Sequence, residues 1–368
     1  MVAMRDEVRW QIWGRVFGFE ILPPKHELDR RRTAHVALAD ALWDEEVRPW
    51  LPEFSSLFAP SGDPDAVASR LKMLATCGYV LGRDLRRLHD PDEREAHDAG
   101  VVSLWLWMAS GVMDYLLDEG LPTAELAHRL APEHLRAALA SPGAAEPHHF
   151  DRPPCPPQLL FTLRAVERAF DGMRTRLARA APGPFRDAVH DELMRSVERM
   201  VGSELGSPQL TLDADVDLDH VEEELRLVNT LLVWTAAYIG LVPGPRPGDD
   251  MLADIRQVAT DLGELAWTLD ALSDVAIDLE AGVWNRVWLA YAREPASHGA
   301  AWRAPTPEGR AAASTGLFRT AVVERLLARV ETLLRGLPAR LAVPGDRVDR
   351  LAGFFRMLAW YFLAPASR

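Results

Sequence analysis

The chain is 368 residues long, and hydrophobic residues make up 48% of it, which is ample material for a large buried core. Its 54 acidic and 41 basic residues give a net charge of −13, and such a surface repels the phosphate backbone of nucleic acids. We therefore expect no nucleic-acid partner, and we expect an anionic ligand to bind only through intervening cations.

The first residues and the two cysteines indicate the compartment. Asp6 and Glu7 interrupt the N-terminal segment before an apolar signal sequence can form. No uncharged apolar stretch reaches about 18 residues, so no transmembrane segment is expected. Cys77 and Cys155 form neither a metal motif nor a disulfide framework, which favours a reducing, cytoplasmic compartment.

Helical periodicity dominates along the whole chain and predicts an all-α protein. Residues 1–60 are interpreted as an N-terminal helical extension, and the Pro-rich segment 141–157 as a long loop. Asp217 or Asp219 is a candidate N-cap for a later helix. Because acidic motifs lie on both sides of the 141–157 loop, we interpret residues 1–368 as a single domain.

The first acidic motif ends an apolar helix over residues 101–120, VVSLWLWMASGVMDYLLDEG. Asp114 and Asp118 are four residues apart, so their carboxylates project from neighbouring turns of one face. Carboxylates beside an apolar cavity are stabilised by a hard cation such as Mg²⁺, which takes oxygen ligands and shares them with phosphate. A solvated helix end is the alternative interpretation.

The second motif places Asp270, Asp274 and Asp278 on three successive turns of a helix, where they form one slanted stripe. Like charges four residues apart destabilise a helix, and no Lys or Arg stands at the compensating spacings. A bound cation would offset this repulsion. An acidic stripe facing solvent is the alternative interpretation.

Together the two motifs resemble those of class I terpene synthases, within the isoprenoid synthase superfamily. The family's first motif is DDxxD, often followed by Glu, and the stretch Asp114–Glu119 matches it with Tyr115 in place of the second Asp. The family's second motif has ligands at i, i+4 and i+8, then Gly at i+12 and often an Asn. Gly282 and Asn285 complete that spacing here.

This resemblance covers roughly residues 65–365 and implies an all-α, single-domain isoprenoid synthase-type helical bundle around a central apolar cavity. It implies an Mg²⁺-dependent terpene synthase that ionises a linear C15 or C20 prenyl diphosphate, cyclises the carbocation and releases diphosphate. The implied ligands of several Mg²⁺ ions are Asp114, Asp118, Glu119, Asp270, Asp274 and Asp278. Among these, the catalytic roles are expected at Asp114, Asp118 and Asp274, and the cavity lining at Tyr115, Trp107 and Trp267. By analogy with the family, a homodimer is a possible assembly.

The expected diphosphate-binding arginines depart from the family pattern. Val228 occupies the position of the family's Arg sensor, and Arg226 is the nearest substitute. The family's C-terminal Arg–Tyr pair is missing, so Arg350 and Arg356 are stand-ins, and Arg286 follows the second motif. For each of these arginines a surface role is the alternative.

Two other functions stay open. The all-Asp second motif is also typical of prenyl-chain-elongating and head-to-head prenyl synthases, although no Arg pair follows Glu119 as elongation would require. A non-catalytic helical isoprenoid-binding or scaffold protein is the third possibility, favoured by Val228 and Tyr115 at family positions.

Overall fold

The computed structural model describes residues 2–49, 64–90, 92–118, 123–139, 150, 155, 157–206, 210–212, 217–242, 250–297, 303, 306–340 and 345–364. Within these ranges the regular structure is helical, apart from one isolated bridge between Thr211 and Val283. The expectation of an all-α protein is confirmed. Among the described helices, none is both long enough and apolar enough to cross a bilayer.

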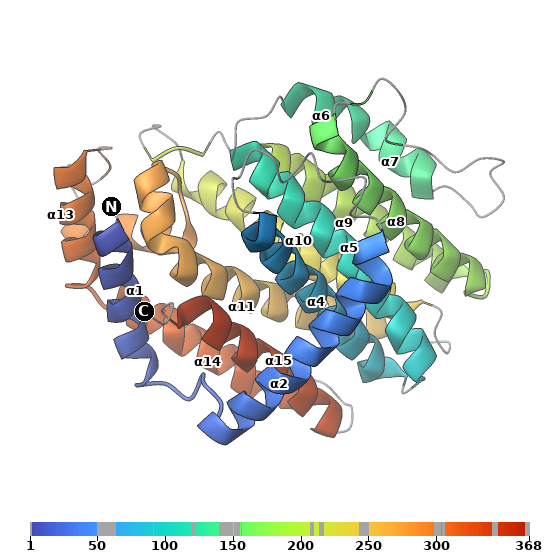
Figure 1. Cartoon of the computed structure of the whole chain (residues 1–368), viewed down its shortest axis with the longest axis horizontal. Coiled ribbons are helices and arrows are strands. Elements are labelled where there is room, and N and C mark those ends of the chain that lie inside the picture. The colour runs from blue at the N-terminus through green and yellow to red at the C-terminus, as the bar shows by residue number, and fades with distance from the viewer. Residues whose placement is uncertain are drawn as a thin grey trace.

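The longest helices pack as two antiparallel pairs in the middle of the molecule (Figure 1). They are α4 (Pro64–His89) with α5 (Glu93–Asp118), and α10 (Leu218–Leu241) with α11 (Asp250–Ala281). Helix α8 (Pro157–Arg179) packs on α5, and α9 (Pro184–Gly206) packs on α10. The short helices α6 (Thr123–Arg129) and α7 (Pro132–Leu139) precede α8, and α7 packs on α8 and α9.

The remaining helices cover the other side of α11. They are α12 (Arg286–Ala292), the 3₁₀ turn η4 (Pro295–Ser297), α13 (Pro307–Leu317), α14 (Val322–Arg340) and α15 (Gly345–Leu363). The N-terminal helices belong to the same bundle, because α1 (Val2–Val16) packs on α11, α14 and α15, while α2 (Lys25–Leu42) packs on α4 and α15. A short π-helical turn, η1 (Trp43–Val47), continues α2.

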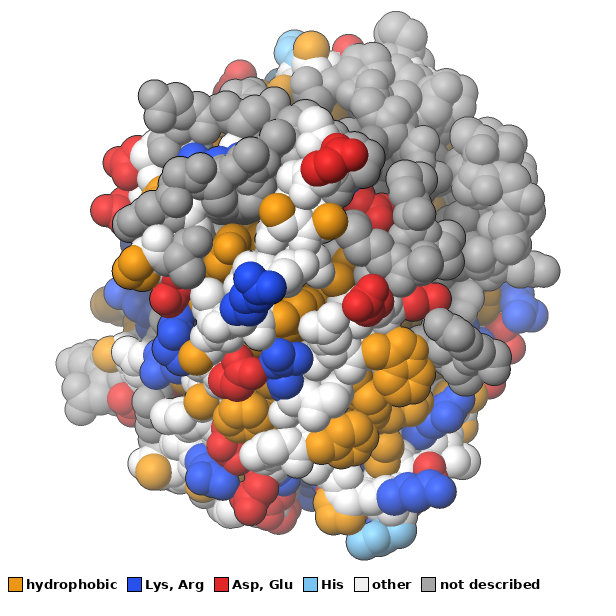
Figure 2. Space-filling view, turned by 90° about the vertical axis from the view of Figure 1, so that its left-hand side faces the viewer, with side chains coloured by type: hydrophobic (Ala, Val, Ile, Leu, Met, Phe, Trp, Pro, Cys, Tyr) orange, Lys and Arg blue, Asp and Glu red, His pale blue; other side chains and the backbone are white. Residues whose placement is uncertain are grey.

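Helices α1 and α13 lie together at one side of the bundle (Figure 1). Figure 2 views the molecule from that side and shows carboxylates, arginines and apolar side chains intermixed. Among the described side chains of this face, the basic ones are scattered, so they offer no continuous track for a phosphate backbone.

Helices α4 and α5 approach closely because α4 carries glycines where it contacts α5. A Cβ at Gly78 would lie 2.7 Å from the Cβ of Trp107, and one at Gly82 would lie 2.5 Å from the Cβ of Ser103. Any larger residue at these positions would push the helices apart. The glycines therefore set the short distance between α4 and α5.

Side-chain contacts fix the register of α10 against α11. The indole of Trp234 donates to the hydroxyl of Thr260 (3.2 Å), and Arg256 donates to the hydroxyl of Tyr238 (3.3 Å). Residue numbers rise on one helix as they fall on the other, so the helices run antiparallel. The beginning of α10 thus lies beside the last turns of α11.

Two buried arginines close the opposite end of the bundle. Arg86 on α4 donates to the carbonyl of Gly240 (3.1 Å), and Arg176 on α8 donates to the carbonyl of Ile239 (3.2 Å). Both carbonyls belong to the last turn of α10, where helix carbonyls lack intrahelical partners and cations are favoured. Arg176 also donates to the carbonyl of Glu95 at the start of α5 (3.2 Å).

Candidate functional site

Three helices bring acidic residues to one end of the bundle, each near its own C-terminus. Asp114 lies on α5, Glu204 on α9, and Asp278 in the last turn of α11. The C-terminal end of a helix carries partial negative charge, so this arrangement favours cations.

Backbone hydrogen bonds tie the chain that follows α9 to the chain that follows α11. The amide of Leu212 donates to the carbonyl of Gly282 (2.7 Å), and the amide of Trp284 donates to the carbonyl of Leu210 (3.0 Å). These bonds form the isolated bridge of the fold. They hold the C-terminal ends of α9 and α11 side by side.

Helix α11 ends at Gly282 in a left-handed turn. Gly282 has φ +74°, a conformation that glycine adopts without a Cβ penalty. The amide of Val283 donates to the carbonyl of Asp278 (2.9 Å), and the amide of Gly282 donates to that of Leu279 (3.3 Å). This is the Schellman arrangement, and it explains why the second motif carries a glycine four residues after its last acid.

Asn285 links the second motif to α12. Its side-chain oxygen accepts hydrogen bonds from the amides of Val287 and Trp288, so it is the N-cap of α12. Its amide nitrogen donates to the carboxylate of Asp278 (2.8 Å). The same residue therefore caps one helix and orients the last acid of the motif.

The pKa of Asp270 is affected by acids of both motifs. Burial raises the pKa of this carboxyl well above its ordinary value. Four other carboxylates raise it further: Asp274, Asp278, Asp114 and Glu204. Asp114 is separated from Asp270 by 156 positions, yet its charge contributes to the raised pKa of Asp270, so the end of α5 lies within electrostatic range of α11.

Glu204 is a member of this group that sequence reasoning missed. It is 2% exposed and accepts a hydrogen bond from the hydroxyl of Ser110 (2.9 Å). Ser110 lies one turn before Asp114 on the same face of α5. No local pattern signals this pairing, because the partners are 94 residues apart.

The donor set is of the kind that Mg²⁺ takes, because every candidate ligand is a carboxylate oxygen. Among the side chains that the structure describes, no three His, Cys, Asp or Glu residues are grouped closely enough to hold a metal ion by themselves. Mg²⁺ is usually held by one or two carboxylates, with water and substrate phosphate completing its shell. The residue types present are therefore compatible with Mg²⁺ as a ligand-sharing ion.

Part of the first motif lies outside the described residues. Glu119 is one such residue, and for Tyr115 and Asp118 only the helical backbone is described. Trp107 lies two turns before Asp114 on the same face of α5, against Gly78 of α4. An apolar cavity of about 20 Å³ lies between α5, α8 and α9, and Ser110 is one of its lining residues.

Arg226 lies at nearly the same height along the bundle as Asp270. The antiparallel register of α10 and α11 places it within about a turn of the level of Asp270. Its guanidinium bonds to the carboxylate of Glu223 at 2.6 Å. The side chain is 38% exposed, so it is held at the surface by that pair.

Arg286 is bound to the flank of α11. It donates to Glu264 (2.8 Å) and to the hydroxyl of Thr268 (2.7 Å), and its guanidinium lies 4.4 Å from the ring centroid of Trp267. Trp267 is buried two turns before Asp274 on the same face. Arg286, which was expected to bind the diphosphate, therefore contacts Trp267, which was expected to line the cavity.

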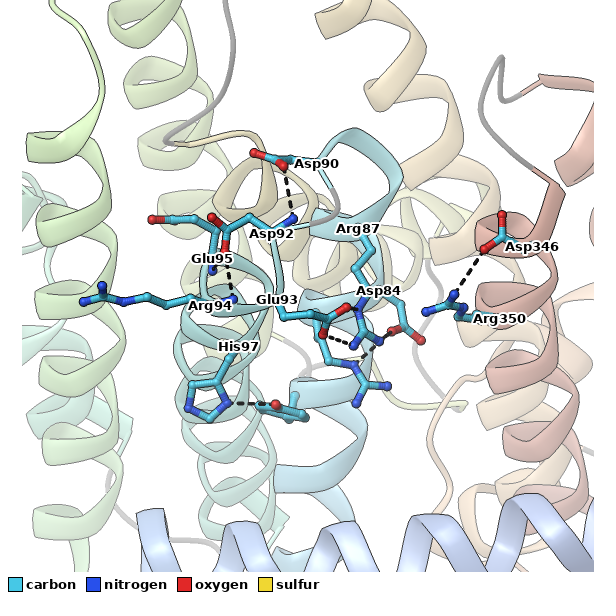
Figure 3. A network of polar contacts seen from close by, with 12 residues as sticks. Asp84, Arg87, Asp90, Asp92, Glu93, Arg94, Glu95, His97, Asp346 and Arg350 are labelled. Carbon is cyan, nitrogen blue, oxygen red and sulfur yellow. Dashed lines mark hydrogen bonds and ion pairs between the residues drawn. The ribbon is translucent and has the colours of Figure 1, made fainter.

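Arg350 and Arg356 are not brought to the acids. Arg350 pairs with Asp346 (3.1 Å) beside the corner between α4 and α5 (Figure 3). Its charge helps to lower the pKa of Glu93, at the start of α5, although the hydrogen bond from Arg87 is the largest cause. Glu93 and Asp114 stand 21 residues apart on one helix, which is roughly 30 Å.

Arg356 lies beside α2. The pKa of Glu27 is lowered mainly by its hydrogen bond from Arg31, and the charge of Arg356 contributes. The Nε of Arg356 is buried without a hydrogen-bond partner. The described contacts of Arg356 thus point to α2 and not to the acidic end.

Comparisons with known proteins place the fold. No protein-family model matches the chain, and no curated protein matches its sequence. A geranylgeranyl pyrophosphate synthase from Lactobacillus brevis superposes with a TM-score of 0.55 at 14% identity, covering 90% of this chain and 97% of that one. The same enzyme complexed with citrate gives 0.51 at 15% identity, covering 91% and 98%. A polyprenyl synthetase from Streptomyces coelicolor A3(2) gives 0.53 at 14% identity, covering 92% and 99%. The chain therefore shares the all-α isoprenoid synthase fold of these proteins.

Proposed function

We propose that the chain is an Mg²⁺-dependent class I terpene synthase that ionises a linear prenyl diphosphate of 15 or 20 carbons and cyclises the resulting carbocation. The observation that supports the proposal is that the charge of Asp114 on α5 acts on Asp270, the first acid of the stripe on α11. Acids from two distant segments raise one carboxyl's pKa together, and cations bound among them would relieve that repulsion.

In this proposal the acidic residues bind the metal ions, and the apolar residues shield the carbocation. Asp114, Asp118, Glu119 and the three acids of α11 would hold the ions, and Arg226 is the arginine best placed along the bundle to meet the diphosphate. Bound Mg²⁺ would act as a Lewis acid that stabilises the leaving diphosphate. The apolar helix faces below the acids would keep water from the carbocation, with Trp107 as the candidate ring face, since Arg286 covers the ring of Trp267.

A second candidate is prenyl-chain elongation. It is favoured by the printed names of the structural neighbours, which are geranylgeranyl pyrophosphate and polyprenyl synthases, and by the all-Asp second motif. The missing Arg pair after Glu119 speaks against it. Elongation joins a C5 diphosphate to the chain, whereas cyclisation needs no partner.

Incubation with C10, C15, C20 and C25 prenyl diphosphates and Mg²⁺ tests the proposal. We expect hydrocarbons or terpene alcohols without a C5 partner, detected by gas chromatography and mass spectrometry. Longer linear diphosphates on addition of the C5 partner would support elongation instead. If no substrate reacts and Mg²⁺ with inorganic diphosphate leaves the melting temperature unchanged, the enzyme assignment fails.

Asp274→Asn supplies the matching variant. Removing one central carboxylate charge should lower kcat/KM by about a hundredfold or more, because cation binding is required for ionisation. Asp254→Asn is the control, since Asp254 is an exposed residue of the same helix five turns earlier. Circular dichroism should show both variants folded. Equal activity in the two variants would contradict the role of Asp274.

A further inference from the structure

A cavity separate from the candidate site lies between α2, α4 and α15. Its volume is about 330 Å³, which is enough for a small organic molecule. Arg83, one of its lining residues, stands one turn before Arg86 on α4. The cavity therefore lies toward the end of the bundle that the buried arginines close, away from the acids.

Three guanidinium groups surround this cavity, one from each helix. Arg31 lies on α2, Arg83 on α4 and Arg350 on α15. Their side chains are 28%, 21% and 52% exposed, so solvent reaches the cavity. Arg350 points from α15 toward α4 (Figure 3). Like charges around one hollow repel each other, and an anion bound among them would offset that repulsion.

The ion pairs of these arginines leave donors for a ligand. Each guanidinium bonds to a carboxylate of its own helix: Arg31 to Glu27 (2.5 Å), Arg83 to Asp84 (3.0 Å) and Arg350 to Asp346 (3.1 Å). None of these pairs crosses from one helix to another. A guanidinium has five N–H donors, and a fork-like pair with a carboxylate uses about two of them. Asp84 also lines the cavity, but Arg87 shares its carboxylate (3.1 Å), so positive charge exceeds negative charge at the lining.

His35 adds a neutral polar group to the cavity. It is 9% exposed, and although its ring packs on Tyr361, it makes no hydrogen bond to a described residue. Burial and the charge of Arg83 lower the pKa of this imidazole to about 4, so at pH 7 it offers one donor and one acceptor nitrogen. A buried polar ring without a hydrogen bond is a group that a ligand would satisfy.

Much of the remaining lining is apolar. Val80, Phe354 and Met357 are at most 6% exposed and line the cavity together with the guanidiniums. Gly353 lets Arg31 lie against α15, because a Cβ at Gly353 would overlap with the guanidinium of Arg31. An inorganic anion alone would leave these apolar walls without contacts, so the lining suits an anion that carries an apolar group.

We propose that this cavity binds a small organic phosphate, whose phosphate group bonds to the guanidiniums of Arg31, Arg83 and Arg350 and whose apolar part lies against the walls formed by α4 and α15. Guanidinium groups bind phosphate oxygens through charge-assisted hydrogen bonds, often two at a time. The bound phosphate would join three helices. The inference does not depend on the proposed function, because it uses none of the acids and no metal ion.

Isothermal titration calorimetry of the full chain in magnesium-free buffer with EDTA tests the site. The probe is n-hexyl phosphate, and inorganic phosphate is the comparison without an apolar part. We expect saturable binding of n-hexyl phosphate, about tenfold or more tighter than inorganic phosphate, because its alkyl chain leaves water for the apolar walls. No saturable binding of n-hexyl phosphate, or equal affinity for the two probes, would overturn the proposal.

Two variants locate the binding. Arg31→Met combined with Arg350→Met removes two guanidiniums and should weaken binding of n-hexyl phosphate about tenfold or more. Gly353→Ala keeps every charge and favours the helix, but its Cβ displaces the guanidinium of Arg31, so it should weaken binding about threefold or more. Arg335→Met is the control, because Arg335 pairs with Glu331 on α14, which does not line the cavity, and its affinity should match the wild type.

The outcomes decide where the phosphate binds. Wild-type affinity in both the double variant and Gly353→Ala would place the phosphate elsewhere and overturn the proposal. If the double variant does not fold, Gly353→Ala decides the question. Flotation with phosphatidylglycerol vesicles distinguishes a soluble ligand from a lipid headgroup. Vesicle binding without binding of n-hexyl phosphate would overturn the proposal in favour of a membrane-facing surface.

Discussion

At the scale of single residues, Glu264 shows how neighbouring charges can override burial. Burial alone would raise the pKa of this carboxyl, but hydrogen bonds from Arg329 and Arg286, with their charges, outweigh it. The pKa falls from an ordinary 4.5 to about 2. Glu264 thus joins α14 and α12 to the flank of α11, next to the candidate site.

We predict that Glu264→Gln lowers the free energy of unfolding by roughly 3 kcal/mol at pH 7, since each pKa unit is worth about 1.4 kcal/mol. A carboxyl whose pKa is lowered by folding stabilises the protein at pH values above its ordinary pKa. That stability is lost as the pH falls through the pKa of the folded state. The difference between wild type and variant should therefore shrink from about pH 4.5 to about pH 2. Urea unfolding across this range measures it. Glu331→Gln, which breaks an exposed pair with Arg335, is the control, and an equal pH profile in both would refute the prediction.

At the scale of the helices, Asn285 has two roles, because it caps α12 and also bonds to Asp278 of the candidate site. Replacing it with alanine removes the N-cap of α12, which costs about 1 kcal/mol, and also the amide that orients Asp278. We predict that Asn285→Ala lowers the melting temperature and also raises the Mg²⁺ concentration for half-maximal activity several-fold.

Thr306→Ala is the matched control for this prediction. Thr306 caps α13 by accepting a hydrogen bond from the amide of Gly309 (3.0 Å), and no hydrogen bond links it to Asp278. It should cost similar stability without changing the Mg²⁺ dependence. Identical Mg²⁺ dependence in the two cap variants would show that Asn285 only caps the start of α12.

The sequence predicts the helical parts of the site where the signal is local. Residues four apart on a helix share a face, so the stripe of Asp270, Asp274 and Asp278 and the buried helix that carries Asp114 follow from spacing alone. The N-cap at Asp217 is likewise a local signal, and its side chain accepts from the amide of Asp219 (3.0 Å).

Contacts between distant segments leave no such signal. Ser110 and Glu204 meet because α5 packs on α9, and nothing within a few residues of either one encodes that contact. For Arg350 the local pattern is misleading. The sequence makes it a stand-in for the family's C-terminal Arg–Tyr pair, but α15 begins at the end of the bundle where Arg86 and Arg176 are buried. Arg350 lies at that end, away from the acids.

At the scale of the whole molecule, the buried arginines make one end of the bundle a structural anchor. We predict that Arg176→Met lowers the free energy of unfolding by roughly 3 kcal/mol, because it leaves the carbonyls of Ile239 and Glu95 without this donor. Denaturant unfolding measures the loss. The Mg²⁺ dependence should stay unchanged, because Glu95 and Asp114 are 19 residues apart on α5, or nearly 30 Å.

Arg174→Met provides the comparison on the same helix. Arg174 pairs with Asp171 (2.6 Å) near the surface, so its loss should change stability by less than about 1 kcal/mol. If the two variants were equally stable, the anchoring role of Arg176 would be refuted.

Because three helix ends converge at the acids, the order in which the metal ion and the diphosphate bind is constrained. A bare diphosphate approaching this mouth meets carboxylates and the negative ends of α5, α9 and α11, all on a protein of net charge −13. A diphosphate that already carries magnesium has lost most of its own charge and is repelled far less. We therefore expect the metal to arrive first or together with the substrate, so that the order of addition is built into the direction in which the helices run.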